Sequence, residues 1–417
     1  MENNYEEHRT RADRIQKDID TLGSYSSVKT IGCTRYTYTK EFAQARDYIK
    51  REMEQAGLEV REDAVGTVIG RLEGTNPELP IIMTGSHFDT VKTGGRYDGA
   101  AGVVAALEVA RTMHDEGFRP KRSIEFVALP EEEGGRFGSG LMASRAMCGK
   151  LYPDELEHRD ENGITLAEAM KEYGLDPAKV GDAAWKEGSI GHFVEAHIEQ
   201  GPVLDQKELE IGLVTGIVGI QRYMVTVHGR ADHAGTTPMD MRMDAVDTAS
   251  KVICKIADWA REKADGTVAT VGFMNVTPGG MNIVAEKVEF TVDIRSMNND
   301  NINDIARRIR AALERECKIM GGTYEIDTKL VIEPVALDAG MLDTLEDSCK
   351  ERGYSYMRLP SGAGHDSLEI GQQLPTVMLF VSSKDGRSHA PVEFSKYSDL
   401  AKASVLMTDL VEKLLNE

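Results

Sequence analysis

Short apolar segments alternate with helical periods in the first half of the chain and again near its end. The strand-like segments are residues 80–87 (PIIMTGSH), 122–130 (RSIEFVALP), 191–201 (GHFVEAHIEQG) and 374–383 (LPTVMLFVSS). Helical periods cover residues 37–60, with an expected helix end at Gly57, and residues 98–117, which end at Gly117. Buried strands that alternate with helices predict an α/β domain with a largely parallel sheet.

The middle of the chain has a different pattern. Residues 220–235 (IQRYMVTVHGRADHAG) and 287–296 (KVEFTVDIRS) alternate apolar and polar positions, and helical periods lie between and after them. This pattern predicts a smaller sheet with one open face and helices on the other. We therefore expect a discontinuous domain over residues 1–212 and 332–417, with a second domain over residues 213–331 inserted within it. An edge strand of the inserted domain is a candidate dimer contact.

Composition and charge exclude several classes of partner. The chain has 417 residues and a formal net charge of −20, so it has no general attraction for nucleic acid or for an anionic membrane. No apolar run approaches the roughly 18 residues of a membrane span, and the charged N-terminal segment lacks the apolar core of a signal peptide. The five scattered cysteines form no CxxC pair, which favours a cytoplasmic location.

Histidine and carboxylate residues follow the predicted strands of the α/β domain. These residues are His87, Asp89, Asp98, the glutamates at 131–133, His197 and His389. Because the carboxyl ends of parallel strands meet at one edge of a sheet, we expect the side chains to converge there. A thiolate-free set of this kind suits Zn, Mn, Co or Ni, and a carboxylate that bridges two ions would form a two-metal hydrolytic centre.

Each of these signals also has an ordinary structural interpretation. A histidine after a strand is commonly a hydrogen-bonded loop residue, the aspartate of "YDG" is typical of a turn, and an acidic triplet commonly faces solvent. The segment "GGRYDGAAG" could suggest a phosphate-binding loop, but it lacks the GxGxxG spacing and the GK[ST] ending. The joint placement of the residues after successive strands favours the metal site.

Seven motifs, in order along residues 85–394, resemble one family. They are "GSHFDTVKTGGRYDGAAGV", "EEEGGRF", "EAHIEQGPVL", "ADHAGTTPMDMRMDA", "GGMNIVAEKVEF", "SGAGHDS" and "GRSHAPVEF". Together they resemble the hydantoinase/carbamoylase branch of the M20 metallopeptidase family. The resemblance implies a catalytic α/β domain that binds two divalent ions, and an inserted lid domain through which the protein forms a homodimer.

The same resemblance implies roles for individual residues. The metal ligands would be His87, Asp98, Glu133, His197 and His389, with Asp98 bridging the ions. Asp89 matches the aspartate that orients the first histidine, because a carboxylate on the far ring nitrogen fixes the tautomer. Counted back from the "GGRF" turn, Glu132 matches the general base, while Glu131 is an additional glutamate for which a solvent-facing position without a role is expected.

Further matches concern the substrate. His233, in "ADHAG", resembles the lid histidine that reaches into the partner subunit's site to stabilise an oxyanion. Arg295 offers a planar fork for a substrate carboxylate. The other expected substrate contacts are Gln200, Asn282 and the small residues Gly362, Ala363 and Gly364. His365 is a weaker candidate and is not included in the metal set.

The leading functional hypothesis is a metal-dependent amidohydrolase that removes the carbamoyl group from an N-carbamoyl-L-amino acid. Its small-molecule substrate would be a ureido acid. The rivals are allantoate amidohydrolase, to which "GIQRYMVTVHG" shows a mild likeness, and then β-ureidopropionase. A dipeptidase or deacylase of the wider family is disfavoured by "HIEQGPVL", and a binding protein that has lost the chemistry is disfavoured by the complete set of ligand-type residues together with Glu132.

Overall fold

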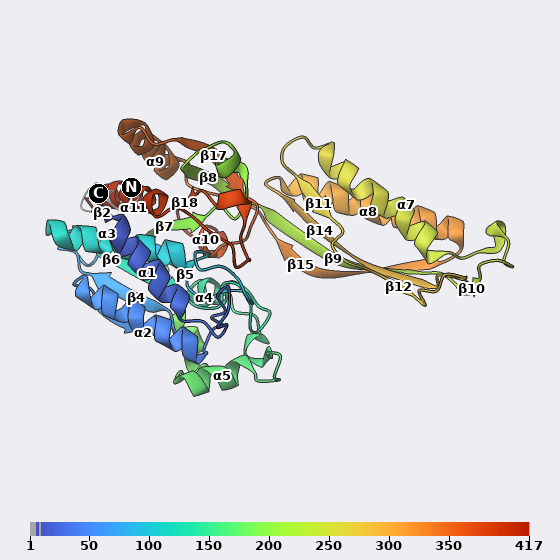
Figure 1. The fold of residues 1–417 in the computed structure, drawn as a ribbon, viewed down its shortest axis with the longest axis horizontal. Helices are drawn as coiled ribbons and strands as arrows, with labels where there is room; N and C mark the ends of the chain where they lie inside the picture. The colour runs from blue at the N-terminus through green and yellow to red at the C-terminus, as the bar shows by residue number, and fades with distance from the viewer. Residues whose placement is uncertain (1–5, 8–9, 417) are drawn as a thin grey trace. The chain divides into compact units, whose positions relative to one another are not determined.

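The computed structural model describes residues 6–7 and 10–416 of the chain and divides into two compact units. Unit 1 combines Thr215 and the residues before it with Leu337 and the residues after it, and unit 2 is Gly216–Ala336. The second unit is therefore an insertion in the first, and Figure 1 shows the elements of each.

Unit 1 is built on a nine-stranded mixed sheet, and one of the nine, the short β16 (Val335–Ala336), is formed by residues just beyond the boundary of the unit. In chain order its strands are β3 (Glu59–Glu62), β4 (Val68–Leu72), β5 (Ile81–His87), β6 (Ile124–Leu129), β7 (Ile190–Ile198), β8 (Ile211–Ile217), β16 (Val335–Ala336), β17 (Tyr356–Ser361) and β18 (Thr376–Val381). The order across the sheet is β16-β8-β18-β7-β5-β6-β4-β3, and β17 pairs with β8. A separate two-stranded sheet pairs β1 (Glu6–Glu7) with β2 (Thr10–Arg11).

The centre of this sheet is parallel, which confirms the predicted fold class. Strands β18, β7, β5 and β6 are parallel neighbours, whereas β3, β4 and β8 pair antiparallel with their neighbours. Residues 63–67, which join β3 to β4, are too few for the crossover that a parallel pair needs. The antiparallel pairing of β3 with β4, which the sequence pattern did not predict, therefore follows from loop length.

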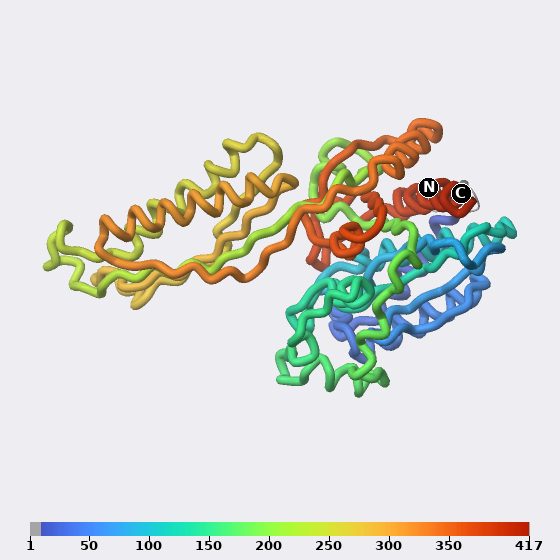
Figure 2. The backbone as a smooth tube through the Cα atoms, turned by 180° about the vertical axis from the view of Figure 1, so that it is seen from behind, coloured from blue at the N-terminus to red at the C-terminus, as the bar shows by residue number. Residues whose placement is uncertain are grey.

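The helices of unit 1 cover the sheet and connect its strands. They are α1 (Ala12–Ser24), α2 (Lys40–Gln55), α3 (Ala100–Glu116), α4 (Met142–Met147), α5 (Leu166–Tyr173), α6 (Val203–Gln206), α9 (Ala339–Arg352), α10 (Asp366–Ile370) and α11 (Tyr397–Asn416). Short 3-10 helices lie at η2 (Glu155–Glu157), η3 (Pro177–Ala183) and η5 (Lys384–Gly386). Helices α1 and α11, from opposite ends of the chain, pack against each other (Figure 2).

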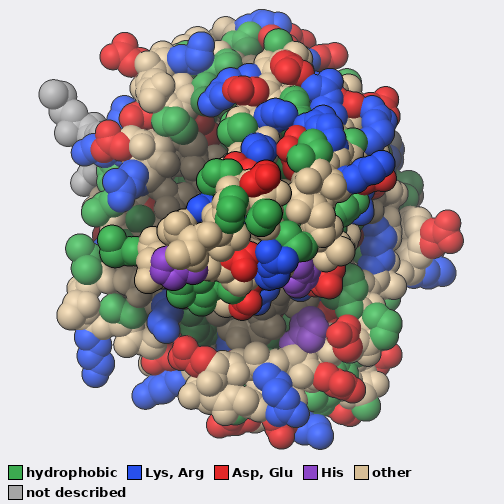
Figure 3. Space-filling model, turned by 90° about the vertical axis from the view of Figure 1, so that its right-hand side faces the viewer, with side chains coloured by type: hydrophobic (Ala, Val, Ile, Leu, Met, Phe, Trp, Pro, Cys, Tyr) green, Lys and Arg blue, Asp and Glu red, His purple; other side chains and the backbone are tan. Residues whose placement is uncertain are grey.

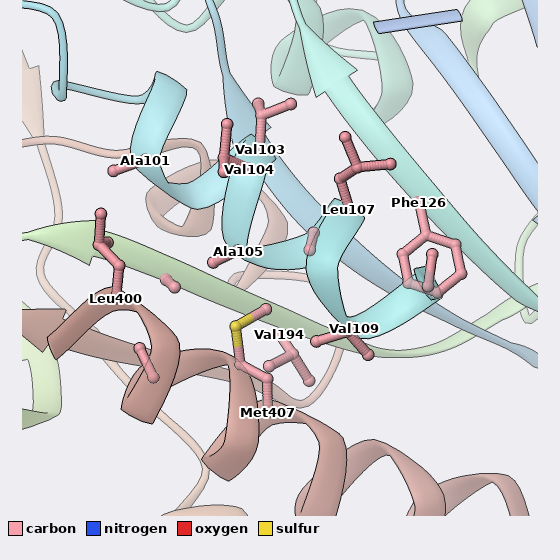
Figure 4. Packing of buried hydrophobic residues seen from close by; sticks show 14 of the residues in the cluster. Ala101, Val103, Val104, Ala105, Leu107, Val109, Phe126, Val194, Leu400 and Met407 are labelled. Atoms are coloured by element: carbon pink, nitrogen blue, oxygen red, sulfur yellow. The ribbon is translucent and has the colours of Figure 1, made fainter. Parts of the chain in front are cut away.

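Helix α3 is the centre of the core of unit 1. Every residue from Ala100 to Met113 is buried, because the helix packs on β5 and β7 on one side and on α1 and α11 on the other. Figure 4 shows Val109 of α3 beside Val194 of β7 and Met407 of α11. The helix is mostly apolar, as such a position requires, and its two buried charged residues, Glu108 and Arg111, form ion pairs with α1. This packing holds the first residues of α3 at the edge of the sheet where the candidate ligands lie.

Unit 2 has a five-stranded antiparallel sheet with helices on one face. Its elements are β9 (Gly219–His228), β10 (Asp232–His233), η4 (Met239–Met241), α7 (Ala245–Arg261), β11 (Val268–Thr270), β12 (Met274–Thr277), β13 (Ile283–Val284), β14 (Lys287–Ser296), α8 (Asn299–Met320) and β15 (Thr323–Ile332). Buried and half-buried residues alternate along β14, and Val288, Phe290, Val292 and Ile294 share a core with α7 and α8. The predicted open-faced sheet is confirmed.

No helix within the described residues is long and apolar enough to cross a bilayer. On the face of the molecule shown in Figure 3, basic side chains are intermixed with acidic ones. The expected cytoplasmic location stays a prediction.

Candidate metal centre

The candidate ligands lie where the parallel strands of unit 1 end. His87 is the last residue of β5, His197 lies at the end of β7, and His389 follows β18. Asp98 lies just before α3, and Glu133 lies in the turn after β6. Because these strands are neighbours in the sheet, their carboxyl ends bring the five side chains to one edge.

One group of ligand atoms is fully buried and contains His87, Asp98 and His197. The Nε2 atoms of His87 and His197 lie 3.4 Å apart. Asp98 Oδ1 lies 3.6 Å from His87 Nε2 and 3.2 Å from His197 Nε2. His197 Nδ1 lies 2.9 Å from the carbonyl oxygen of Ile198. Since Nδ1 donates there, Nε2 keeps its lone pair for a metal.

A second group shares Asp98 with the first and contains Glu133 and His389. Asp98 Oδ2 lies 3.2 Å from His389 Nε2, which is 3.3 Å from Glu133 Oε2. A third, overlapping group contains His87, Glu132 and Glu133. Within each group the ligand atoms lie within 4.8 Å of one another, and none is a thiolate. The donor set therefore fits a divalent cation of the Zn, Mn, Co or Ni class.

The electrostatics of these groups reflect carboxylates crowded into a buried space. Burial opposes the charged form of Asp98, but hydrogen bonds to His197, His389 and His87 hold its pKa well below the usual value. Burial and the nearby Asp98 carboxylate raise the pKa of Glu133 to about 7. The hydrogen bond to Asp98 raises the pKa of His389 to about 9. A bound cation would neutralise this excess of buried negative charge.

Gly99 allows the Asp98 loop to approach His87 closely. Its φ is +61°, and a Cβ at this position would lie 2.3 Å from the His87 ring. Any L side chain would therefore be strained and would also collide with the candidate ligand.

Asp89 has two kinds of contact near the centre. Its Oδ1 lies 3.4 Å from His87 Nδ1, the ring nitrogen on the side away from the ligand group. The orienting role that the resemblance implies for Asp89 stays a prediction. The same carboxylate also accepts hydrogen bonds from the backbone N–H groups of Glu132 and Glu133, at 3.1 and 3.2 Å. The structure thus adds a contact with the acidic turn that the sequence analysis did not anticipate.

The acidic triplet 131–133 is buried or half-buried, and the solvent-facing position expected for Glu131 is wrong. Glu131 is 1% exposed, has a φ of +53°, and accepts a hydrogen bond from Phe137 N at 3.1 Å. Its own N–H donates to Thr37 Oγ1 at 3.0 Å. Burial and the Asp89 carboxylate raise its pKa to about 8. Glu131 thus holds the glycine-rich turn that follows it.

Glu132 lies beside the histidine end of the centre. Its Oε2 is 3.6 Å from His87 Nε2, and its side chain is buried. Burial, followed by the nearby Glu133, Asp366 and Asp89 carboxylates, raises its pKa well above the usual value, although His87 acts in the opposite direction. The raised pKa favours the protonated form of Glu132 in this buried site, and its carboxyl group is placed to exchange a proton with a group bound beside His87.

Of the four other candidates of unit 1, Gln200 contacts the centre, and the remaining three precede a histidine that lies beside it. Gln200 Nε2 donates to Asp98 Oδ2 at 2.8 Å. Gly362, Ala363 and Gly364 directly precede His365, whose ring lies 4.5 Å from that of His197. His365 Nε2 is 2.8 Å from Ser361 Oγ, and His365 belongs to none of the three ligand groups.

Three candidates belong to unit 2, where two are neighbours and the third is remote. The backbone of Asn282 accepts from Ala234 N at 2.9 Å, directly after His233. His233 Nδ1 accepts from Gly235 N and Thr236 N at 3.1 and 3.2 Å, so the proton of its neutral ring is on Nε2.

Arg295 lies toward the opposite end of β14 and is paired with Asp293. Its Nε is 2.8 Å from Asp293 Oδ1, and its Cα partner in the sheet is Ile220. The His233 segment pairs instead with Ile283, before β14 begins at Lys287. Unit 2 therefore does not bring Arg295 together with His233 and Asn282.

Sequence reasoning missed two polar residues beside the ligands, Ser388 and Glu393. Ser388 Oγ donates to Asp98 Oδ2 at 2.7 Å, and Glu393 accepts from the backbone of Asp98. Both lie in the motif "GRSHAPVEF", from which only His389 had been selected. The signal that could have identified them is that both are polar and lie within five positions of each other, on either side of the candidate ligand His389.

Comparisons with known proteins agree with this geometry. A model of the peptidase family M20/M25/M40 matches residues 83–413. The N-carbamoyl-L-amino-acid amidohydrolase of Paenarthrobacter aurescens is 42% identical over 97% of this chain and 98% of its own length. The allantoate amidohydrolase of Bacillus subtilis strain 168 is 38% identical over 95% of this chain and 96% of its own length.

A solved structure agrees as well. The crystal structure of an amidase of the hydantoinase/carbamoylase family from Burkholderia multivorans matches with a TM-score of 0.89 and 31% identity, over 97% of this chain and 98% of that chain. The chain therefore belongs to peptidase family M20/M25/M40 and, within it, to the hydantoinase/carbamoylase branch, as an amidohydrolase of the carbamoylase/allantoate amidohydrolase group that acts on non-peptide C–N bonds.

Proposed function

We propose that the protein hydrolyses the carbamoyl C–N bond of an N-carbamoyl-L-amino acid to the amino acid, CO2 and ammonia. The observation that carries this proposal is the Asp98 carboxylate, whose two oxygens face separate ligand groups while Glu132 lies beside them. We infer that the two groups hold two divalent ions per subunit, of Zn, Mn, Co or Ni. Such ions supply Lewis-acid charge and lower the pKa of a water molecule.

Glu132 moves the proton in this proposal. Its carboxylate takes a proton from the attacking water and delivers it to the leaving nitrogen, which has to be protonated as it departs. Asp89 keeps His87 and the backbone of Glu132 in place through the contacts described above. Because its pKa is raised, the Glu132 carboxyl group favours its protonated form, as it must to hold the proton between the two steps.

The substrate contacts follow from the chemistry of a ureido acid. The guanidinium of Arg295 would bind the substrate carboxylate through two hydrogen bonds. The amides of Gln200 and Asn282 would contact polar groups of the substrate. The backbone of Gly362, Ala363 and Gly364 would line the same pocket, because small residues allow close approach.

The nearest alternative substrate is allantoate, which is also a ureido acid. It is supported by the 38% identity with an allantoate amidohydrolase, against 42% for the carbamoylase. β-Ureidopropionase activity ranks third. Dipeptidase or deacylase activity belongs to the wider family and is less favoured.

A panel of substrates tests the assignment directly. With Mn²⁺, Co²⁺ or Zn²⁺ added, we expect ammonia release from N-carbamoyl-L-amino acids to exceed release from allantoate and from N-carbamoyl-β-alanine. Removal of divalent ions with a chelator should abolish the release, and added ions should restore it, because the reaction needs an acidified water. Cleavage of dipeptides alone would move the protein to the peptidase class, and full activity after chelation would exclude the metal mechanism.

The separation of residues within unit 2 supports a dimeric active site. Arg295 lies eight positions after Lys287 on β14, a length of about 26 Å in an extended strand. A ureido acid is much shorter than this distance. One copy of unit 2 therefore cannot offer both Arg295 and the His233–Asn282 pair to one substrate, and we propose that His233 and Asn282 serve the site of a partner subunit in a homodimer.

Mixed dimers test this arrangement. His233→Ala should lower kcat about 10²- to 10³-fold, because an Nε2–H donor for the oxyanion is lost. When this variant is unfolded and refolded together with Glu132→Gln chains, one site of each mixed dimer is intact. We expect about a quarter of the wild-type activity to return after random pairing. No recovery, with mixed dimers verified by two affinity tags, would place His233 in the site of its own chain.

A further inference from the structure

Glu393 is a buried glutamate whose contacts all lie on the loops that carry candidate ligands. It is 5% exposed and lies in the loop between β18 and α11. Its Oε1 accepts hydrogen bonds from the backbone N–H groups of Tyr97 and Asp98, at 2.8 and 3.0 Å. The acceptor and the donors are almost 300 positions apart in the chain. This one side chain therefore fixes the backbone of the candidate bridging residue.

The other oxygen of Glu393 faces Ser388, which in turn contacts Asp98. Ser388 Oγ lies 3.0 Å from Glu393 Oε2 and 2.7 Å from Asp98 Oδ2. A hydroxyl group has one proton, so Ser388 Oγ donates to only one of the two carboxyl groups; the contact with the other is a hydrogen bond when that carboxyl group is protonated and donates to Oγ. The chain Glu393–Ser388–Asp98 thus reaches the side chain of Asp98 as well as its backbone.

The geometry of both loops is adapted to this contact. A Cβ on Gly95 would lie 2.1 Å from Glu393 Oε1, so a larger residue at position 95 would displace the carboxylate. His389, next to Ser388, has a φ of +53°, a left-handed conformation that is strained for a non-glycine residue. The surrounding contacts have to maintain this conformation, and Glu393 is one of them through Ser388.

We propose that Glu393 is a positioning residue that, through Ser388 and two backbone N–H groups, aligns Asp98 and His389 and thereby sets the affinity of the centre for divalent ions. This inference rests on the proposed metal-binding role of Asp98 and His389. Partners of this kind, which orient ligands without touching the metal, typically change affinity 10- to 100-fold when removed.

Zn²⁺ titration of chelator-stripped protein against a chromophoric competitor tests the proposal. We expect Glu393→Ala to bind Zn²⁺ 10- to 100-fold more weakly than wild type. Glu393→Gln should stay within about threefold, because its Oε1 accepts from both N–H groups and its amide donates to Ser388 Oγ. Ser388→Ala should also weaken Zn²⁺ binding. The double variant Ser388→Ala/Glu393→Ala should bind Zn²⁺ only slightly more weakly than Glu393→Ala alone, because the effects of residues that act in one chain of contacts do not add.

Asp63→Ala is the matched control for a purely structural effect. Asp63 Oδ1 also accepts from two backbone N–H groups, those of Val65 and Thr67, at 2.9 and 2.8 Å, in the loop between β3 and β4. We expect this variant to melt at a lower temperature in stripped form and to keep wild-type Zn²⁺ affinity.

The outcomes separate this proposal from the proposed function. Wild-type Zn²⁺ affinity in folded Glu393→Ala would overturn the positioning role of Glu393. If Glu393→Ala does not fold, wild-type Zn²⁺ affinity in Ser388→Ala would overturn it instead. Wild-type protein that binds no Zn²⁺ would overturn both proposals. If the variants show the expected order of Zn²⁺ affinities but the wild-type protein does not hydrolyse ureido acids, only the proposed function would be overturned.

Discussion

Glu132→Gln should reduce kcat for the hydrolysis of N-carbamoyl-L-amino acids by about 10²- to 10⁴-fold while the protein keeps its divalent ions. The amide has nearly the same shape as the carboxyl group, but it can neither take a proton from water nor pass one to the leaving nitrogen. The measurement is kcat under saturating metal, together with the metal content of the purified variant by atomic emission.

The metal content matters because the structure places Glu132 in a potential ligand group with His87 and Glu133. Loss of an ion in Glu132→Gln would make this residue a ligand, and unchanged kcat would exclude it as the base. Glu131→Gln is the matched control, since Glu131 is an adjacent buried glutamate that contacts the backbone of Phe137. We expect this control to lower the melting temperature and leave kcat within a few-fold.

Much of the fold could be predicted because its signals are local. The parallel strands β5, β6, β7 and β18 are short, mostly apolar segments, and α3 is a mostly apolar helix that ends before Gly117. In unit 2 the alternation along β14 predicted its burial pattern. The antiparallel strands at the edges of the large sheet were not predicted, because short half-buried strands such as β3 have no long apolar run.

For five residues of the candidate site, the sequence predicted that they would lie together. His87, Asp98, Glu133, His197 and His389 could be selected because their motifs and their positions after strands agree, and the structure brings all five together. Their roles as ligands stay predictions.

The environment of the neighbouring residues could not be read from local sequence. Burial of Glu131 depends on Thr37 and on the fold of the following turn, and the contact of Glu393 with Asp98 joins distant segments. An acidic triplet has the same composition on a surface and in a core. Only the packing of the rest of unit 1 around it decides between the two.

Asp98→Ala should remove both ions, whereas substitution of a ligand from one group should remove one. Asp98 belongs to two of the three ligand groups, with His87 and His197 through Oδ1 and with Glu133 and His389 through Oδ2. We expect Zn²⁺ affinity to fall by more than about 100-fold, beyond the effect typical of residues that only orient a ligand, and hydrolysis to fall below detection.

The pattern across variants distinguishes a shared carboxylate from two independent sites. His389→Ala, at a half-exposed position, should leave one tightly bound ion per chain, and Asp98→Ala should leave almost none. Calorimetric titration of stripped protein with Zn²⁺ gives both the number of ions and their affinities, and circular dichroism verifies that each variant is folded. A tightly bound ion that persists in Asp98→Ala would show that one ligand group is complete without this carboxylate. The bridging role would then be wrong, and the activation of water would have to be assigned to a single ion held by the remaining histidines and glutamates.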